Sequence, residues 1–256
     1  MRTAQKAQQS RLYDVSITVG LIAYGVVHLL IAWIALQLAW GKSSEEASQT
    51  GALQELADKP FGKVLLWVVA IGLFALVIWK GLELAYGRLE KTEKKVSAAG
   101  RGVVYLFLGI TAIRVATGSA GSSTGNQRSM SARLMENGAG RVLIVIVGLV
   151  IIGIGVRQIY KSVTKKFTED LAGGVSDTTI LLGRIGYAAK GIAFIVVGVL
   201  FAWASISYDP KKAGGLDAAL HTVKDQPFGS VLLTMMALGL ACYGVYCFVW
   251  SRNAKH

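Results

Sequence analysis

The stretch DKPFGKVLL at residues 58–66 recurs as DQPFGSVLL at residues 225–233. A third copy, ENGAGRVLI at residues 136–144, keeps the acid and the glycine but lacks the proline and the phenylalanine. Each copy lies between two apolar runs, and the first of these contains a second repeated segment: GVVHLLIA, GVVYLFLG and GIAFIVVG, beginning at Gly25, Gly102 and Gly191. Because both sets of segments recur at nearly equal spacing, the chain consists of three tandem copies of one unit.

The composition indicates a membrane protein. Of the 256 residues, 53% are hydrophobic and 16% are charged, and the mean hydropathy is +0.50, whereas soluble domains carry about 25% charged residues. The first apolar run is much longer than a signal-peptide core of roughly 7–15 residues, so we expect it to be retained. Most runs approach the roughly 20 residues that span a bilayer; they lie at residues 16–40, 64–86, 102–117, 142–160, 185–207 and 231–250.

Each unit is predicted to be a helical hairpin that crosses the membrane twice. We expect an all-α integral membrane protein with six transmembrane helices, in repeats at residues 16–88, 97–161 and 181–252, after an N-terminal segment at residues 1–15. Since all three hairpins then have the same orientation, any pseudo-threefold axis runs along the membrane normal. A closed bundle and a linear stack of hairpins both fit this pattern.

The basic residues predict the topology. With Arg157 assigned to the fourth loop, 15 of the lysines and arginines lie in the two termini and the second and fourth loops, and nine lie in the other three loops. By the positive-inside rule, both termini are cytoplasmic in a protein of the inner (cytoplasmic) membrane. The net charge of +12 favours anionic lipid headgroups as partners. It does not favour nucleic acid, because no basic segment carries interleaved aromatic residues.

Three two-helix repeats, a glycine-plus-aromatic first helix and an FG or AG start to the second resemble the bacterial domain-of-unknown-function 1206 family. The resemblance covers residues 17–252. It implies a six-helix integral membrane protein of uncharacterised role, and it supplies no catalytic or ligand residues.

The repeated motifs predict packing and corners. Small residues let membrane helices approach closely, and those aligned in the first helices are Gly25, Gly102, Gly191, Ala32, Gly109 and Gly198. Before each second helix we expect a short interfacial helix that is ended by proline, with an acid near the start of the spanning helix, phenylalanine at the water boundary and glycine for close approach. The corner residues are Asp58, Pro60, Phe61, Gly62, Asp225, Pro227, Phe228 and Gly229.

Few ionisable residues lie in the apolar runs, and such residues are candidates for function. His28 is aligned with Tyr105, and Arg114 is aligned with Gln37; these four form a candidate intramembrane polar site. Alternatively, His28 is a neutral histidine bonded to a neighbouring helix, and Arg114 extends to the interface. Lys190 is interpreted as an interfacial anchor.

The sequence predicts no enzyme. No catalytic motif, metal-ligand cluster or cofactor motif occurs, and Cys242 and Cys247 lie on different helix faces. The favoured function is a membrane scaffold or accessory subunit that binds lipids, other membrane proteins or a second copy of itself. The alternative is a small transporter or channel with a pathway near the repeat interface.

Overall fold

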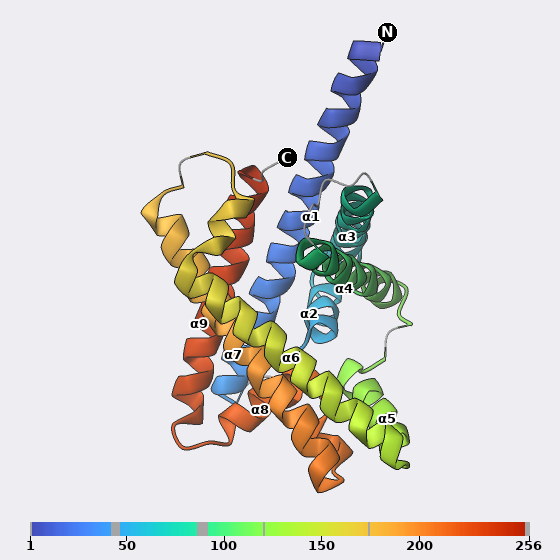
Figure 1. The fold of residues 1–256 in the computed structure, drawn as a ribbon, viewed down its shortest axis with the longest axis vertical. Helices are drawn as coiled ribbons and strands as arrows, with labels where there is room; N and C mark the ends of the chain where they lie inside the picture. The colour runs from blue at the N-terminus through green and yellow to red at the C-terminus, as the bar shows by residue number, and fades with distance from the viewer. Residues whose placement is uncertain (1, 42–46, 86–91, 120, 174, 254–256) are drawn as a thin grey trace.

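The computed structural model describes residues 2–41, 47–85, 92–119, 121–173 and 175–253 (Figure 1). Every regular element in these residues is a helix. Stretches of 19 to 30 residues in six helices are long and apolar enough to cross a membrane, which confirms the six predicted spans and the multi-pass membrane class. The spanning helices are α1 (Arg2–Ala39), α3 (Gly62–Ala85), α4 (Thr92–Ala116), α6 (Gly138–Thr164), α7 (Asp177–Ser207) and α9 (Gly229–Arg252).

Shorter helices connect the spanning ones. One short helix was expected before the second spanning helix of each repeat, and the three are present as α2 (Gln49–Ala57), α5 (Ser123–Met135) and α8 (Gly215–Lys224). Serine hydroxyls cap two of them, since Ser48 accepts the N–H of Gly51 at 3.1 Å and Ser122 accepts that of Gly125 at 2.7 Å. Two 3-10 turns, η1 (Lys166–Asp170) and η2 (Pro210–Lys212), flank α7.

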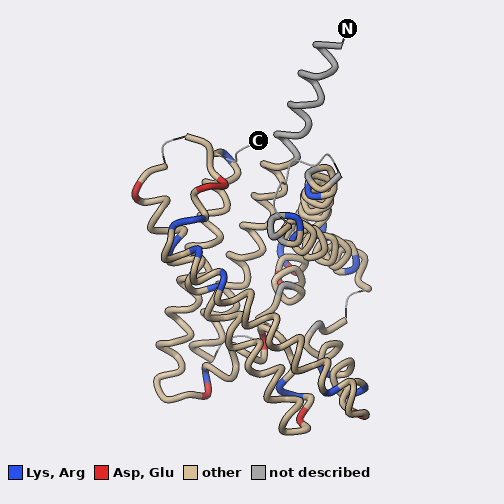
Figure 2. The backbone as a smooth tube through the Cα atoms, in the orientation of Figure 1, with Lys and Arg blue, Asp and Glu red and all other residues tan. Residues whose placement is uncertain are grey.

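Charged residues are scarce along the middle of the spanning helices. Figure 2 shows long uncharged stretches in each of them, as expected for helices that meet hydrocarbon. Several charged residues of the loops lie outside the described part of the chain, namely Lys42, Glu45, Glu46, Arg88, Lys91 and Lys255.

The three repeats form a ring in which every repeat packs on the other two, although the two spanning helices of repeat two stay apart. Repeat one is α1–α3, repeat two is α4–α6 and repeat three is α7–α9. The second spanning helix of each repeat packs on the first of the next, so that α3 packs on α4 and α6 packs on α7. The ring closes where α9 packs on α1 (Figure 1). A linear stack would leave those two helices apart, so the pseudo-threefold arrangement is the one adopted.

Glycines bring the helices of consecutive repeats into backbone contact. A methyl group on Gly155 of α6 would lie 2.7 Å from the carbonyl oxygen of Gly191 on α7. The equivalent interface repeats this contact, because a methyl group on Gly25 of α1 would lie 2.9 Å from the carbonyl oxygen of Gly244 on α9. Such distances leave no room for a side chain. Helix association in lipid depends on this kind of close packing.

The other aligned small residues contact side chains or backbone in the same interfaces. Gly198 meets the carbonyl oxygen of Gly148, and Gly109 meets the ring of Phe74. Gly102 has ordinary contact with Cβ of Lys80, and Ala32 is 5% exposed.

The corners of repeats one and three are tight turns. The N–H of Gly62 donates to the carbonyl of Lys59 at 2.8 Å, and that of Gly229 donates to the carbonyl of Gln226 at 2.8 Å. Proline occupies the second position of each turn, and the phenylalanine after it has a φ of 61° at Phe61 and 60° at Phe228. This left-handed conformation costs a residue with a side chain roughly 1–2 kcal/mol. Both rings are more than 80% exposed.

Two features of the corners differ from the expectation. Asp58 and Asp225 are C-cap residues of α2 and α8, and α9 begins after Phe228 without a side-chain cap. The acid therefore belongs to the end of the short helix, and the turn separates it from the spanning one. In repeat two, Oδ1 of Asn137 accepts the N–H of Gly140 at 2.7 Å and caps α6 in place of the proline turn.

Repeat two is also the open hairpin. In repeats one and three the two spanning helices pack on each other, α1 on α3 and α7 on α9. Within the described residues, α4 and α6 share no packed interface. Instead, α4 packs on α3 and α2, and α6 packs on α7 and α5.

The glycine contacts generate a matched test. We expect Gly155→Val to lower the unfolding free energy in detergent by about 1–3 kcal/mol, because the added atoms overpack the α6–α7 interface. Gly153→Val is the control, since no atom lies within 4 Å of a methyl group placed there. Unfolding followed by circular dichroism during titration with sodium dodecyl sulfate measures both. Equal losses in the two variants would contradict the packing described.

Candidate functional site: two cavities beside the open repeat

The separation of α4 from α6 coincides with a cavity of about 470 Å³, here called the outer cavity. Its walls come from both helices, with α5 between them, and they are mostly apolar. The lining residues are Thr50, Phe107, Thr111, Arg114, Gly121, Asn126, Gln127, Met130, Ser131, Leu134, Leu143, Ile144, Val147 and Phe201.

A second cavity of about 190 Å³, the inner cavity, lies among α1, α7, α8 and α9. Gln127 and Phe201 line both cavities, so the two spaces share a wall. The other lining residues of the inner cavity are His28, Ile31, Ile151, Lys190, Ala193, Phe194, Val197, Gly215, Leu216 and Leu240.

Lys190 of α7 places a buried amine in the wall of the inner cavity. Its side chain belongs to a residue only 8% exposed, and its Nζ donates to the hydroxyl of Tyr24 at 2.7 Å. Nζ also lies 4.1 Å from the ring centre of Tyr243 and 4.9 Å from that of Tyr24. These ring faces stabilise a positive charge. The interpretation of Lys190 as an interfacial anchor is therefore wrong, because the ring arrangement of the repeats turns this position inward.

His28 lies beside Lys190 in the same wall. It is 4% exposed, and its Nδ1 is 2.9 Å from the carbonyl oxygen of Tyr24. Because a carbonyl only accepts, Nδ1 carries the proton, and in the neutral ring Nε2 is an acceptor. The ring also contacts the rings of Tyr24 and Tyr243, with centres 4.3 and 4.8 Å away. The interhelical environment expected for His28 is thus made of tyrosines, although its hydrogen bond stays within α1.

The four residues of the predicted polar site do not meet in one cavity. Tyr105 is buried and its ring lies 5.4 Å from that of Tyr24, but it lines neither cavity. Arg114 is exposed and lines the outer cavity, and its Nη2 donates to the carbonyl of Ser119 at 3.4 Å. Gln37 is half-buried and lines neither.

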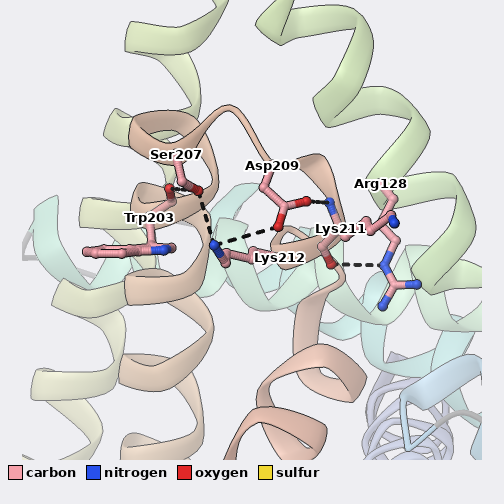
Figure 3. A network of polar contacts seen from close by, with 6 residues as sticks. All are labelled: Arg128, Trp203, Ser207, Asp209, Lys211 and Lys212. Carbon is pink, nitrogen blue, oxygen red and sulfur yellow. Dashed lines mark hydrogen bonds and ion pairs between the residues drawn. The ribbon is translucent and has the colours of Figure 1, made fainter.

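A polar network holds α5, and with it Gln127, against the end of α7 (Figure 3). Nε of Arg128 donates to the carbonyl of Lys211 at 3.0 Å. Asp209 organises that turn, because its Oδ1 accepts the N–H of Lys211 at 3.1 Å and its Oδ2 lies 3.6 Å from Nζ of Lys212. Nζ of Lys212 also donates to the hydroxyl of Ser207 at 3.3 Å. Arg128 therefore fixes the position of Gln127, the preceding residue, at the boundary of the two cavities.

Aromatic residues close the bundle at the end where η1 lies. Phe167 of η1 is fully buried and stacks on Tyr187, with ring centres 5.2 Å apart. The hydroxyl of Tyr246 donates to the carbonyl of Phe167 at 3.2 Å, and Nε1 of Trp250 donates to that of Asp170 at 3.2 Å. No cavity wall comes from η1. The outer cavity therefore depends mainly on the helices of the open repeat, and the inner cavity mainly on those of repeats one and three.

The ionisable residues that line the cavities are all basic. Their ionisable lining residues are His28, Arg114 and Lys190, and neither wall includes a carboxylate. Within the described residues, no group of three histidine, cysteine or acidic side chains could hold a metal ion. The chemistry of the walls favours a ligand with apolar parts and a group that accepts hydrogen bonds.

The comparisons with known proteins match the repeat pattern. The family described as Domain of Unknown Function (DUF1206) matches three times, over residues 19–87, 96–165 and 185–254. The chain belongs to the DUF1206 family. The uncharacterised protein YxxB of Bacillus subtilis (strain 168) is 28% identical over 241 residues, which cover 90% of this chain and 87% of that protein. No solved structure matches the chain.

In this DUF1206 protein, the residue that sequence reasoning missed is Lys190. Its signal is the repeat alignment, which places Tyr24, Arg101 and Lys190 at one position. A position that is polar in all three repeats and lies within an apolar helix points to the axis of a closed ring. Without knowledge that the ring closes, the same residues resemble interfacial anchors.

A double-mutant cycle tests the contact at the centre of this site. Tyr24→Phe removes the hydroxyl that accepts from Lys190, so we expect it to lower the unfolding free energy by about 1–3 kcal/mol. Lys190→Met removes the charge, and Tyr24→Phe should then cost less in that background. Detergent unfolding of the four proteins gives the coupling energy. Additive effects would show that the two side chains do not interact.

Proposed function

We propose that this protein is a small transporter whose ligand enters through the open second repeat. The observation that supports this function is the pair of adjoining cavities. Exposed Arg114 lines the outer cavity, buried His28 and Lys190 line the inner one, and Gln127 and Phe201 line both. Membrane helices normally close such gaps by packing, whereas here α4 and α6 remain apart.

The scaffold function is the second candidate. Small-residue motifs suggested partner-binding faces, but Gly148, Gly155 and Gly244 contact glycines of this same chain. What still favours an accessory subunit is α6, which is the least buried of the six spans and exposes a long apolar face. Lipid covers such a face as readily as a partner protein does. The cavities are therefore stronger support for a transporter than the apolar face is for an accessory subunit.

We assign no chemical step to the cavities. His28 and Lys190 both bond to Tyr24, and no lining carboxylate is present to act with them as an acid or base. A non-enzymatic role follows as part of the proposal.

The proposed orientation places both termini in the cytoplasm of a bacterial cell. The excess of basic residues in the termini and in the second and fourth loops supports it. With this orientation, the outer cavity and α5 lie toward the outside, and η1 lies toward the cytoplasm. Anionic headgroups of the inner leaflet are the expected partners of the basic side.

Transport is tested by bridging the open repeat. Phe107 of α4 and Leu143 of α6 both line the outer cavity, so cysteines there can be joined by a reducible bifunctional thiol reagent. Proteoliposomes are assayed for translocation of fluorescent phospholipids and for uptake of radiolabelled carboxylates. We expect bridging to reduce flux at least about fivefold and reduction to restore it.

The control is Leu143→Cys alone, treated with the same reagent, because a single thiol cannot be bridged within one chain. Native cysteines are replaced by alanine throughout. Absence of flux for every probe, or flux that ignores the bridge, would overturn the transport proposal. Crosslinking of the chain to one stoichiometric membrane partner in cells would then favour the accessory subunit.

The orientation has its own test. Alkaline phosphatase fused after Arg252 should be inactive in a bacterial host, whereas phosphatase inserted after Lys211, in the loop before α8, should be active. A fluorescent protein fused after Arg252 is the reciprocal control and should fluoresce. The opposite pattern of activities would reverse the proposed topology.

A further inference from the structure

We infer that the inner cavity binds the anionic head of an amphipathic molecule, with Lys190 as its counter-ion and the outer cavity holding its apolar chain. The inference rests on the proposed function only in the route, because the ligand reaches Lys190 through the outer cavity. The chemical class is a single negative charge on an apolar chain, which both a fatty acid and an anionic phospholipid supply.

The cavity wall offers the Lys190 ammonium no counter-ion of its own. A charged ammonium is costly inside a membrane unless an anion or several hydrogen-bond acceptors surround it. It has three donors, and one of them is used by Tyr24. The wall offers no carboxylate, and Asp217 on nearby α8 is directed elsewhere, because its Oδ1 accepts the N–H of Ala47 at 2.9 Å and lies 3.6 Å from Nε2 of His221.

The side-chain amide of Gln127 is a polar group at the boundary of the two cavities. Gln127 lines both, and its amide can donate to an anionic oxygen. A head that lies between Lys190 and Gln127 therefore meets a cation and a neutral donor.

The outer cavity supplies the apolar path. Phe107, Met130 and Leu143 line the outer cavity and are 57%, 63% and 48% exposed. Phe107 and Leu143 belong to spanning helices, so this side of the cavity borders hydrocarbon when the helices lie in a membrane. Its volume of about 470 Å³ lies within the roughly 300–1,000 Å³ typical of small-molecule sites. An acyl chain can extend from the head toward the bilayer without leaving apolar surroundings.

Equilibrium binding of tritiated laurate to the full chain in a neutral maltoside detergent tests the site. We expect Lys190→Gln to weaken binding about tenfold or more, since a charge-assisted contact is lost. Gln127→Glu should weaken it at least fivefold by repulsion, and it changes an exposed residue of α5, so it stays informative if the Lys190 variant does not fold. Lys63→Gln is the control, because this exposed lysine lines neither cavity.

Competitors identify the source of the anion. Displacement by phosphatidylglycerol but not phosphatidylcholine, with the same dependence on Lys190, supports a bilayer lipid, and laurate binding without that displacement supports a free acid. Dodecanol that competes as well as laurate, or affinity unchanged in the folded variants, would overturn the site. Laurate binding without flux would contradict the transport proposal and would still support the binding site. Flux that falls on bridging, together with laurate affinity that is unchanged by the Lys190 and Gln127 substitutions, would support transport and contradict the binding site.

Discussion

The backbone contact between glycines of consecutive repeats is the interaction on which the rest of the structure depends. Gly155 meets Gly191 between α6 and α7, and Gly25 meets Gly244 between α1 and α9. Lipid supplies no hydrophobic force between helices, so such contacts decide which helices pair. They join repeat two to repeat three and repeat three to repeat one, whereas α3 and α4 meet through the ring of Phe74 against Gly109. Within repeats one and three, Gly20 and Gly186 approach the backbone of the second spanning helix as closely, and among the described glycines none makes such a contact between α4 and α6. Repeat two separates, which produces the outer cavity.

Closure of the ring also determines the polar interior. Tyr24 and Lys190 occupy the same position in different repeats, and the ring turns both inward until the hydroxyl accepts from the ammonium. His28 joins them one helical turn further along α1, through the carbonyl of Tyr24. A fold assembled from three copies thus gathers polar groups that are far apart in sequence, and two of them, His28 and Lys190, line the inner cavity.

The sequence predicts the periodic features and misses those that depend on closure. Six spans, three short helices and the close approach at Gly62 and Gly229 follow from local patterns that recur, and the structure contains them. The open repeat was not predictable, because loss of proline and phenylalanine at the second corner says nothing about which helices pair. Lys190 was misplaced for the same reason: burial there arises from α1 and α9, which are distant in the chain.

The separation of α4 from α6 is the central claim, and distance measurement between spin labels in lipid nanodiscs tests it most directly. One label pair lies on Phe107 and Leu143, and aligned pairs lie on Leu30 and Leu65 in repeat one and on Val196 and Leu232 in repeat three. The account predicts a longer distance across repeat two than across the other two repeats. Three equal distances would contradict it, because all three hairpins would then be closed.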